Sequence, residues 1–123
     1  MKKPKLETVT VDGLVQLFVE LCIAQDRELL RGDVPAINRL FDRIEAIESE
    51  LKSRPGDQRS ALVPLYHHDS MQVRVKAAKA TLAIKPEAAR KALEAIQASK
   101  WQPQAGEAGM SLWTLDRGIF KPT

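Results

Sequence analysis

The sequence is poor in the residues that cross-link small secreted proteins or build metal and redox sites. Cys22 is the single cysteine, so no intramolecular disulfide can form. There are two histidines, and aromatic residues make up only 5% of the chain. No apolar run approaches the roughly 20 residues that a membrane-spanning helix needs. A disulfide scaffold and an integral membrane protein are therefore excluded, and we expect a protein of the cytoplasm.

The start of the chain imitates a secretory signal, because three lysines precede an apolar run at 14–24. No small-residue cleavage site follows that run. Polar side chains also interrupt the region, at Glu7, Asp12, Gln16 and Glu20. We predict instead a loose N-terminal arm over residues 1–10.

What the chain does have is an ordinary globular composition with unevenly distributed charge. Its 123 residues, 44% of them hydrophobic and 28% charged, suffice for one core. The net charge is +3, yet residues 6–57 contain eleven acidic and six basic residues, a balance of −5. Residues 58–100 contain eight basic and three acidic residues, a balance of +5. We therefore expect a bipolar surface, which bears on the choice of partner more than on the fold.

Helical spacing of apolar residues predicts two long helices in the first half of the chain. The first, over about residues 12–30, has a wide apolar stripe and ends at Gly32. Asp33 is the expected cap of the second helix, and Pro35 suits its first turn. This second helix runs to about Arg54, with an apolar face opposite a charged one.

Shorter helices are predicted in the second half. After a Pro-Gly break at 55–56, a short helix is expected up to the two histidines at 67–68. Asp69 is the expected cap of the next helix, with Gln72 placed as in a capping box, and Pro86 opens another helix that runs to about residue 100. In the turn-rich tail, 101–123, we expect one short helix over about 108–115, ended by Gly118. Three apolar residues of this tail are expected to dock on the core, namely Leu112, Leu115 and Ile119.

Residues 61–78 resemble a HEAT repeat, and they read ALVPLYHHDSMQVRVKAA. In that family a short helix ends in an acidic turn, a Val-Arg pair follows, and an Ala-Ala step opens the second helix. The resemblance extends over 61–96, and it implies that Asp69 and Arg74 are structural residues that support the turn. The matching positions are Asp69, Val73, Arg74, Ala77 and Leu82. The implied fold is all-α, a short, irregular right-handed α-α superhelix of armadillo or HEAT type with about five to six helices, placed over residues 11–100.

The whole chain also resembles a small bacterial family known only as a domain of unknown function. The resemblance rests on the helical pairs and on the ending, which reads GMSLW at 109–113 and GIFKP at 118–122. That family has an armadillo-type helical fold, so the resemblance supports the predicted architecture and implies no chemistry.

No group of residues in the sequence forms a recognisable catalytic, metal or cofactor site. There is no Gly-x-Ser-x-Gly turn and no glycine-rich phosphate loop. Cys22 lies on the apolar stripe of the first helix, so we interpret it as a core residue with an unreactive thiol. His67 and His68 are adjacent on a helix end, where side chains diverge by about 100° and cannot face one ion. We therefore expect neither an enzyme nor a bound metal or cofactor.

Carboxylates gather on the second helix, at Asp42, Glu45 and Glu48. Such a group could serve acid–base chemistry or bind divalent ions. However, Arg39, Arg43 and Lys52 are interleaved with the carboxylates at helical spacing. We expect a solvated face with weak ion pairs.

The strongest candidate surface is a cluster of cations in the second half. It consists of Lys76, Lys79, Lys85, Arg90 and Lys91. With Trp101 and Trp113 as stacking side chains, this surface could meet nucleic-acid phosphates or an acidic protein. The alternative is that the cations form a solvated face without a role and that both tryptophans anchor the tail.

Two functions are compatible with the sequence. A protein-binding module is favoured, because stacked helix pairs expose long faces, and an immunity or antitoxin-like role would suit a bipolar surface. The alternative is a HEAT-like nucleic-acid-binding protein that uses the basic face of residues 74–91, although a net charge of +3 is low for that role. Homodimerisation fits either function.

Overall fold

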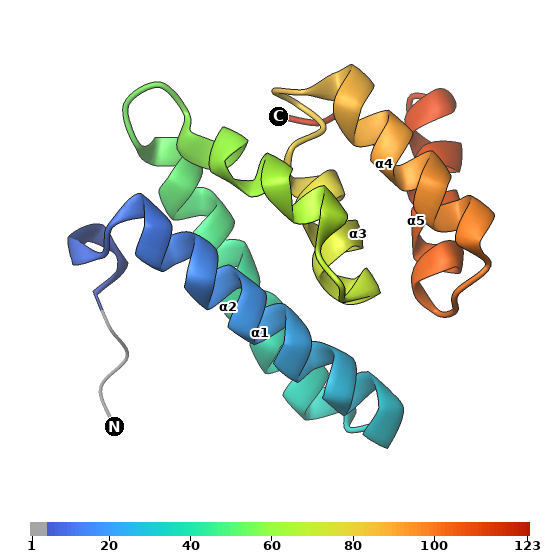
Figure 1. Cartoon of the computed structure of the whole chain (residues 1–123), viewed down its shortest axis with the longest axis horizontal. Helices are drawn as coiled ribbons and strands as arrows, with labels where there is room; N and C mark the ends of the chain where they lie inside the picture. The colour runs from blue at the N-terminus through green and yellow to red at the C-terminus, as the bar shows by residue number, and fades with distance from the viewer. Residues whose placement is uncertain (1–4) are drawn as a thin grey trace. The chain divides into compact units, whose positions relative to one another are not determined.

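The computed structural model describes residues 5–123, which contain helices and no strand, as expected for an all-α protein (Figure 1). The chain divides into two compact units, Met1–Ala61 and Leu62–Thr123, which we call the first and the second unit. Within residues 5–123, none of the helices combines the length and the apolarity that crossing a bilayer requires. The right-handed superhelix stays a prediction.

The first unit is a helical hairpin of α1 (Val11–Arg31) and α2 (Val34–Ser53), preceded by the 3₁₀ turn η1 (Leu6–Thr8). The Thr10 hydroxyl caps α1 by accepting a hydrogen bond from the backbone N–H of Gly13 at 3.0 Å. The predicted turn is confirmed, because Gly32 ends α1 with a φ of 71° and Asp33 Oδ1 accepts from the N–H of Ala36 at 3.1 Å. Figure 1 shows α1 and α2 side by side as a result of this tight turn.

The segment before α1 is attached to the hairpin and is not a loose arm. The Arg54 guanidinium donates to the carbonyl of Leu6 at 3.0 Å and to that of Val9 at 2.7 Å. Its Nε also donates to Glu50 at 2.7 Å. The prediction of a loose arm is therefore wrong for residues 6–9, and its first four residues lie outside the described part of the chain.

The second unit contains α3 (Met71–Ala80), α4 (Pro86–Ser99) and α5 (Gln104–Asp116). The segment η2 (Gln58–His67), predicted as an ordinary short helix, is a 3₁₀ helix with Pro64 inside it. The cap of α3 is Ser70, whose hydroxyl accepts from the N–H of Val73 at 3.3 Å, and not Asp69. Pro86 opens α4 as predicted.

The core of the second unit combines side chains from its three α-helices. It consists of Val75, Ala78, Leu82, Ala89, Leu93, Ile96, Ala108 and Leu112. Its small residues allow close helix packing, and partly buried Tyr66 packs against the same core and shares a short hydrogen bond with Thr81. The side-chain amides of Gln104 and Gln72 are buried together, with Gln104 Nε2 donating to Gln72 Oε1 at 3.0 Å.

The C-terminal segment is more regular than its sequence predicts. Helix α5 begins at Gln104, several residues before the predicted start, and packs against α4 and α3. A Cβ on Gly109 would lie 2.8 Å from Gln97 Nε2 of α4, so a larger residue at this position would require the Gln97 side chain to move. Leu112 is buried and Leu115 packs on the core, but the prediction for Ile119 is wrong, because it is 65% exposed.

Candidate functional site

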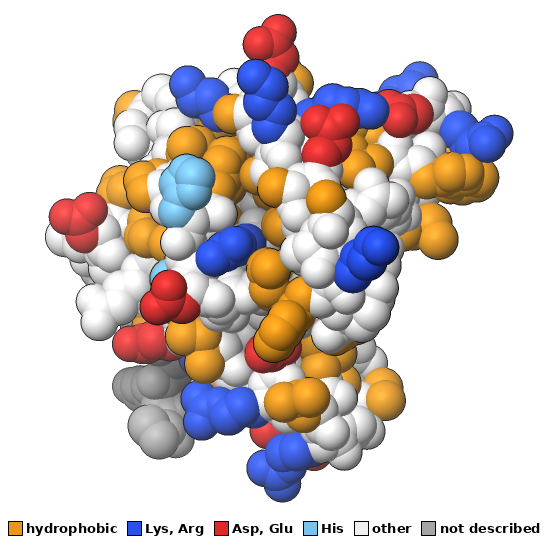
Figure 2. Space-filling view, turned by 45° about the vertical axis from the view of Figure 1, so that its right-hand side comes forward, with side chains coloured by type: hydrophobic (Ala, Val, Ile, Leu, Met, Phe, Trp, Pro, Cys, Tyr) orange, Lys and Arg blue, Asp and Glu red, His pale blue; other side chains and the backbone are white. Residues whose placement is uncertain are grey.

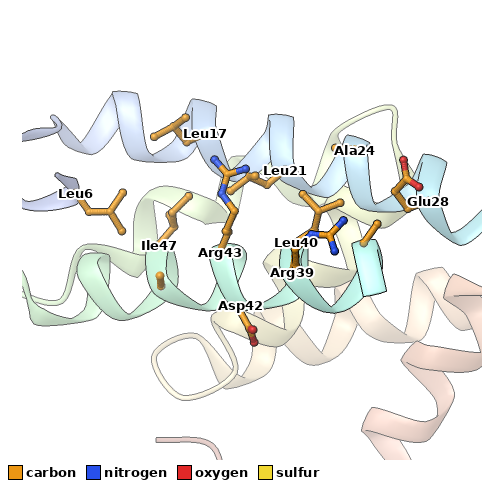
Figure 3. A pocket seen from close by; sticks show the side chains of 12 residues that line it. Leu6, Leu17, Leu21, Ala24, Glu28, Arg39, Leu40, Asp42, Arg43 and Ile47 are labelled. Carbon is orange, nitrogen blue, oxygen red and sulfur yellow. The ribbon is translucent and has the colours of Figure 1, made fainter. Parts of the chain in front are cut away.

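The first unit contains a groove between α1 and α2 with a volume of about 670 Å³. Leu6 lies at one end of the groove and Glu28 at the other (Figure 3). The floor is apolar and is built by both helices, from Leu17, Leu21, Ala24, Ala36, Leu40 and Ile47. Several lining residues remain exposed, among them Arg39, Arg43 and Ala46, so the groove is open to solvent along one side. Such a surface can accommodate an extended apolar partner.

The groove exists because α1 has a wider apolar face than its core packing uses. Leu14, Phe18 and Cys22 form the fully buried stripe of this helix. Leu17 and Ala24 are displaced around the helix from that stripe and are only partly buried. The wide apolar stripe in the sequence was the signal of this second face. From the sequence alone, the whole stripe was interpreted as core.

Two arginines, Arg39 and Arg43, stand at the groove without intramolecular partners. Within residues 5–123, neither guanidinium makes a hydrogen bond or an ion pair. They are one helical turn apart on α2. In Figure 3 Arg43 lies between Leu17 and Leu21 of α1. The prediction that these arginines form weak ion pairs with the carboxylates of α2 is wrong.

The carboxylates near the groove do not neutralise these arginines. Glu28 pairs with Arg31 at 3.7 Å, and Glu50 is bound by Arg54. Asp42 points away from α1 in Figure 3. Of the four charged residues that line the groove, Arg39 and Arg43 are thus the two on the groove side of α2 that have no ion pair within residues 5–123.

The predicted basic surface of the second unit is largely occupied by its own carboxylates. Lys76 and Lys79 of α3 both bind Glu107 Oε2 of α5, at 3.0 and 3.1 Å. Burial alone would raise the pKa of Glu107, but the attraction and hydrogen bonds of the two ammonium groups outweigh burial and lower that pKa. These two lysines therefore tie α3 to α5.

Arg90 of α4 is paired in the same way. Its guanidinium binds both carboxylate oxygens of Asp116, at 2.7 and 3.0 Å, and these hydrogen bonds lower the pKa of Asp116. Lys85 and Lys91 are exposed and make no ion pair within the described residues. On the face drawn in Figure 2, Lys and Arg side chains are interspersed with acidic, hydrophobic and other side chains. The cations that sequence proximity grouped together are thus divided among different partners.

The two tryptophans are exposed and are not buried anchors of the tail. Trp101 is 63% exposed and Trp113 is 49% exposed. The guanidinium of Arg117 lies 4.5 Å from the centroid of the Trp113 ring, which is a cation–π contact. Within residues 5–123, no described contact joins either ring to Lys76 or Lys79.

The sequence also drew attention to Arg74, Asp69, His68 and Cys22, and the structure shows the burial or the hydrogen bonds of each. Arg74 Nε donates to the backbone carbonyl of His68, which holds the turn before α3, whereas Asp69 is exposed. His68 Nδ1 accepts from the N–H of Ser70 at 3.0 Å. Cys22 is fully buried. Within residues 5–123, no three or more His, Cys, Asp or Glu side chains come together in a way that could hold a metal ion.

An all-helical chain with these features has a close structural counterpart. The crystal structure of the protein RPA1889 from Rhodopseudomonas palustris CGA009 superposes with a TM-score of 0.95 and is 50% identical in sequence, covering 98% of this chain and 100% of that chain. Residues 12–116 match the family described as "Domain of unknown function (DUF2019)", and the chain belongs to this family. Among curated proteins there is no match.

Proposed function

We propose that this protein is a non-catalytic protein-binding module whose contact surface is the groove of the first unit. The observation that carries the proposal is an apolar groove floor beside two arginines that have no partner within residues 5–123. An apolar surface of this kind gains free energy when a partner covers it. The HEAT-like pairing of helices predicted from the sequence supports the same role, because folds of that type act mainly by contact.

The second unit supplies little support for nucleic-acid binding. Lys76, Lys79 and Arg90 already bind Glu107 or Asp116, so phosphates would have to displace carboxylates to reach them. Neutralised cations add little to the counterion release that drives such binding. We therefore favour a protein partner over a nucleic acid.

Site-specific photocrosslinking tests this function. Ala46 lines the groove and is exposed, so a benzoylphenylalanine at this position can reach a bound partner without entering the core. Ala95 of α4 is also exposed and lies outside the groove, which makes it the matched control position. Irradiation is done in a lysate of the source organism, with and without nuclease treatment.

A discrete protein adduct at position 46, absent from position 95, is the expected result. Adducts of equal yield at both positions would contradict the proposal. The absence of any adduct at position 46, or its loss on nuclease treatment, would do the same.

A further inference from the structure

We infer that the groove accepts an amphipathic α-helix of another protein, and that the polar edge of this helix carries carboxylates facing Arg39 and Arg43. The inference rests on the proposed function and adds the chemical class of the partner. It is argued from the shape of the groove, the charges along it and the poor match of helix α5 from a second copy.

The shape of the groove favours a helix. Two adjacent helices leave a linear channel between them, into which the apolar side chains of a third helix can pack. The stretch of α1 that lines the channel, from Leu17 to Glu28, spans about 16 Å at 1.5 Å per residue, or about three turns of a docked helix. A small molecule is a poorer fit, since such ligands are held in sites that cover most of their surface and this groove is open along one side.

The charges along the groove favour an acidic partner. Helical geometry places Arg39 and Arg43 on the groove side of α2, while Glu45 and Glu48 point to other sides of that helix. Two carboxylates do line the groove, but Glu28 is paired with Arg31 and Asp42 points away from α1 (Figure 3). A partner that covers two arginines without supplying an opposite charge would leave them desolvated and unpaired, which is costly.

The spacing of the arginines specifies the partner further. Residues four apart on a helix lie about 6 Å from each other on one face. Carboxylates at i and i+4 of the docked helix, beside apolar residues at i, i+3, i+4 and i+7 spacing, would match both arginines and the apolar floor together.

Helix α5 of a second copy is a less suitable occupant. The exposed apolar residues of α5, Met110 and Trp113, are followed one turn later by Arg117. The neighbouring Asp116 is already bound by Arg90. This helix would bring positive charge to a groove that is itself positive.

The test uses three fluorescent peptides of about 16 residues, each long enough to cover the groove as a helix. The first has leucines at helical spacing and glutamates along both edges of the leucine stripe. In the second, lysines replace the glutamates. In the third, alanines replace the leucines. Binding to the full chain is measured by fluorescence anisotropy at low and at moderate salt.

Two charge-matched variants locate the binding. Arg39→Gln with Arg43→Gln removes the groove cations. Lys52→Gln with Lys91→Gln removes two exposed lysines, one on a different side of α2 and one on α4, and changes the net charge equally. Circular dichroism is used to check that each variant is folded.

We expect saturable binding of the glutamate–leucine peptide alone, about tenfold weaker in the arginine variant and unchanged in the lysine variant. Added salt should weaken this binding. Equal binding of the lysine peptide, equal weakening in both variants, or no saturable binding would overturn the inference. If crosslinking at position 46 still captures a protein, only the carboxylate-bearing helix is refuted and the protein-binding function stands.

Discussion

The two candidate surfaces, one in each unit, differ in how many of their cations are already paired. In the second unit, Lys76 and Lys79 share Glu107, and Arg90 is held by Asp116. In the first unit, Arg39 and Arg43 have no such partner within the described residues and stand beside an apolar groove. The half of the sequence that is rich in cations thus pairs several of them within its own structure, while two cations of the acidic half have no ion pair within the described residues.

This difference shows why local charge density is a poor guide to a binding surface. A cation is available to a binding partner only when it does not already form an ion pair within its own protein. Arg54 makes the same point inside the first unit, because it binds Glu50 and two backbone carbonyls and is a structural residue. Arg39 and Arg43, which we propose to contact a partner, are therefore expected to be dispensable for stability.

The largest effect is expected in the core of the second unit. Leu93 is fully buried, and Leu93→Ala should lower the free energy of unfolding by about 2 to 5 kcal/mol because it removes apolar contacts and leaves a cavity. Leu30→Ala is the control, since Leu30 is 83% exposed and should change stability by less than about 0.5 kcal/mol. Urea unfolding followed by circular dichroism measures both. Losses of similar size would contradict the description of this core.

The ion pairs of the second unit give the next largest effect. Glu107→Gln should lower the free energy of unfolding by about 2 kcal/mol at neutral pH, because two lysines lose their carboxylate. Glu94→Gln is the control, since its ion pair with Arg90 is 3.7 Å long and its side chain is 53% exposed.

The pH dependence of this effect has a definite sign. Folding lowers the pKa of Glu107 from its ordinary 4.5, so its contribution is present above the unfolded-state pKa and is lost as the pH falls through the folded-state pKa. The difference between the wild type and Glu107→Gln should therefore vanish in acid. A difference that grows with acidity would show that the lysines do not stabilise the ionised carboxylate.

A smaller and equal effect in both units is expected at the glycines that end α1 and α5. Gly32 has a φ of 71° and Gly118 a φ of 70°, a left-handed conformation that costs other residues about 1 kcal/mol. Gly32→Ala and Gly118→Ala should each lower the melting temperature, and the asparagine variants should lower it less because asparagine tolerates this conformation. Equal losses for alanine and asparagine would argue against this backbone explanation.

The smallest effect is expected at the groove. Arg39→Gln with Arg43→Gln should change the free energy of unfolding by less than about 0.5 kcal/mol, since no hydrogen bond or ion pair within the described residues is removed. Arg54→Gln, in the same unit, should cost about 1 to 2 kcal/mol because three hydrogen bonds are lost. Denaturant titrations compare the two variants. A large loss for the arginine pair would make them structural residues.

The sequence predicted the helices where local chemistry determines their ends. Gly32, Asp33 and Pro86 end, cap or open helices as expected. The start of α5 was missed because Gly106 and Gly109 lower intrinsic helix propensity. Tertiary contacts, which local sequence rules do not include, stabilise this helix. They are the burial of Ala105, Ala108 and Leu112 and the hydrogen bond between the side-chain amides of Gln104 and Gln72.

The pairing of the cations and the groove also depend on tertiary packing, which the sequence does not reveal. Glu107 is 31 residues from Lys76, so the pairing of Lys76 and Lys79 depends on the packing of α5 against α3. The interleaved charges of α2 looked like mutual partners, whereas helical geometry directs Arg39 and Arg43 away from Glu45 and Glu48. The wide apolar stripe of α1 was the only visible sign that this helix has a second apolar face.

Amide chemical-shift mapping tests the central claim most directly. The isotope-labelled full chain is titrated with the glutamate–leucine peptide, and shifts are followed along the backbone. The groove predicts the largest shifts around Leu21, Leu40 and Arg43, on both helices of the first unit. Shifts that centre instead on Trp113 of α5 or on Lys85 and Lys91 would show that the second unit provides the binding surface and would contradict the account.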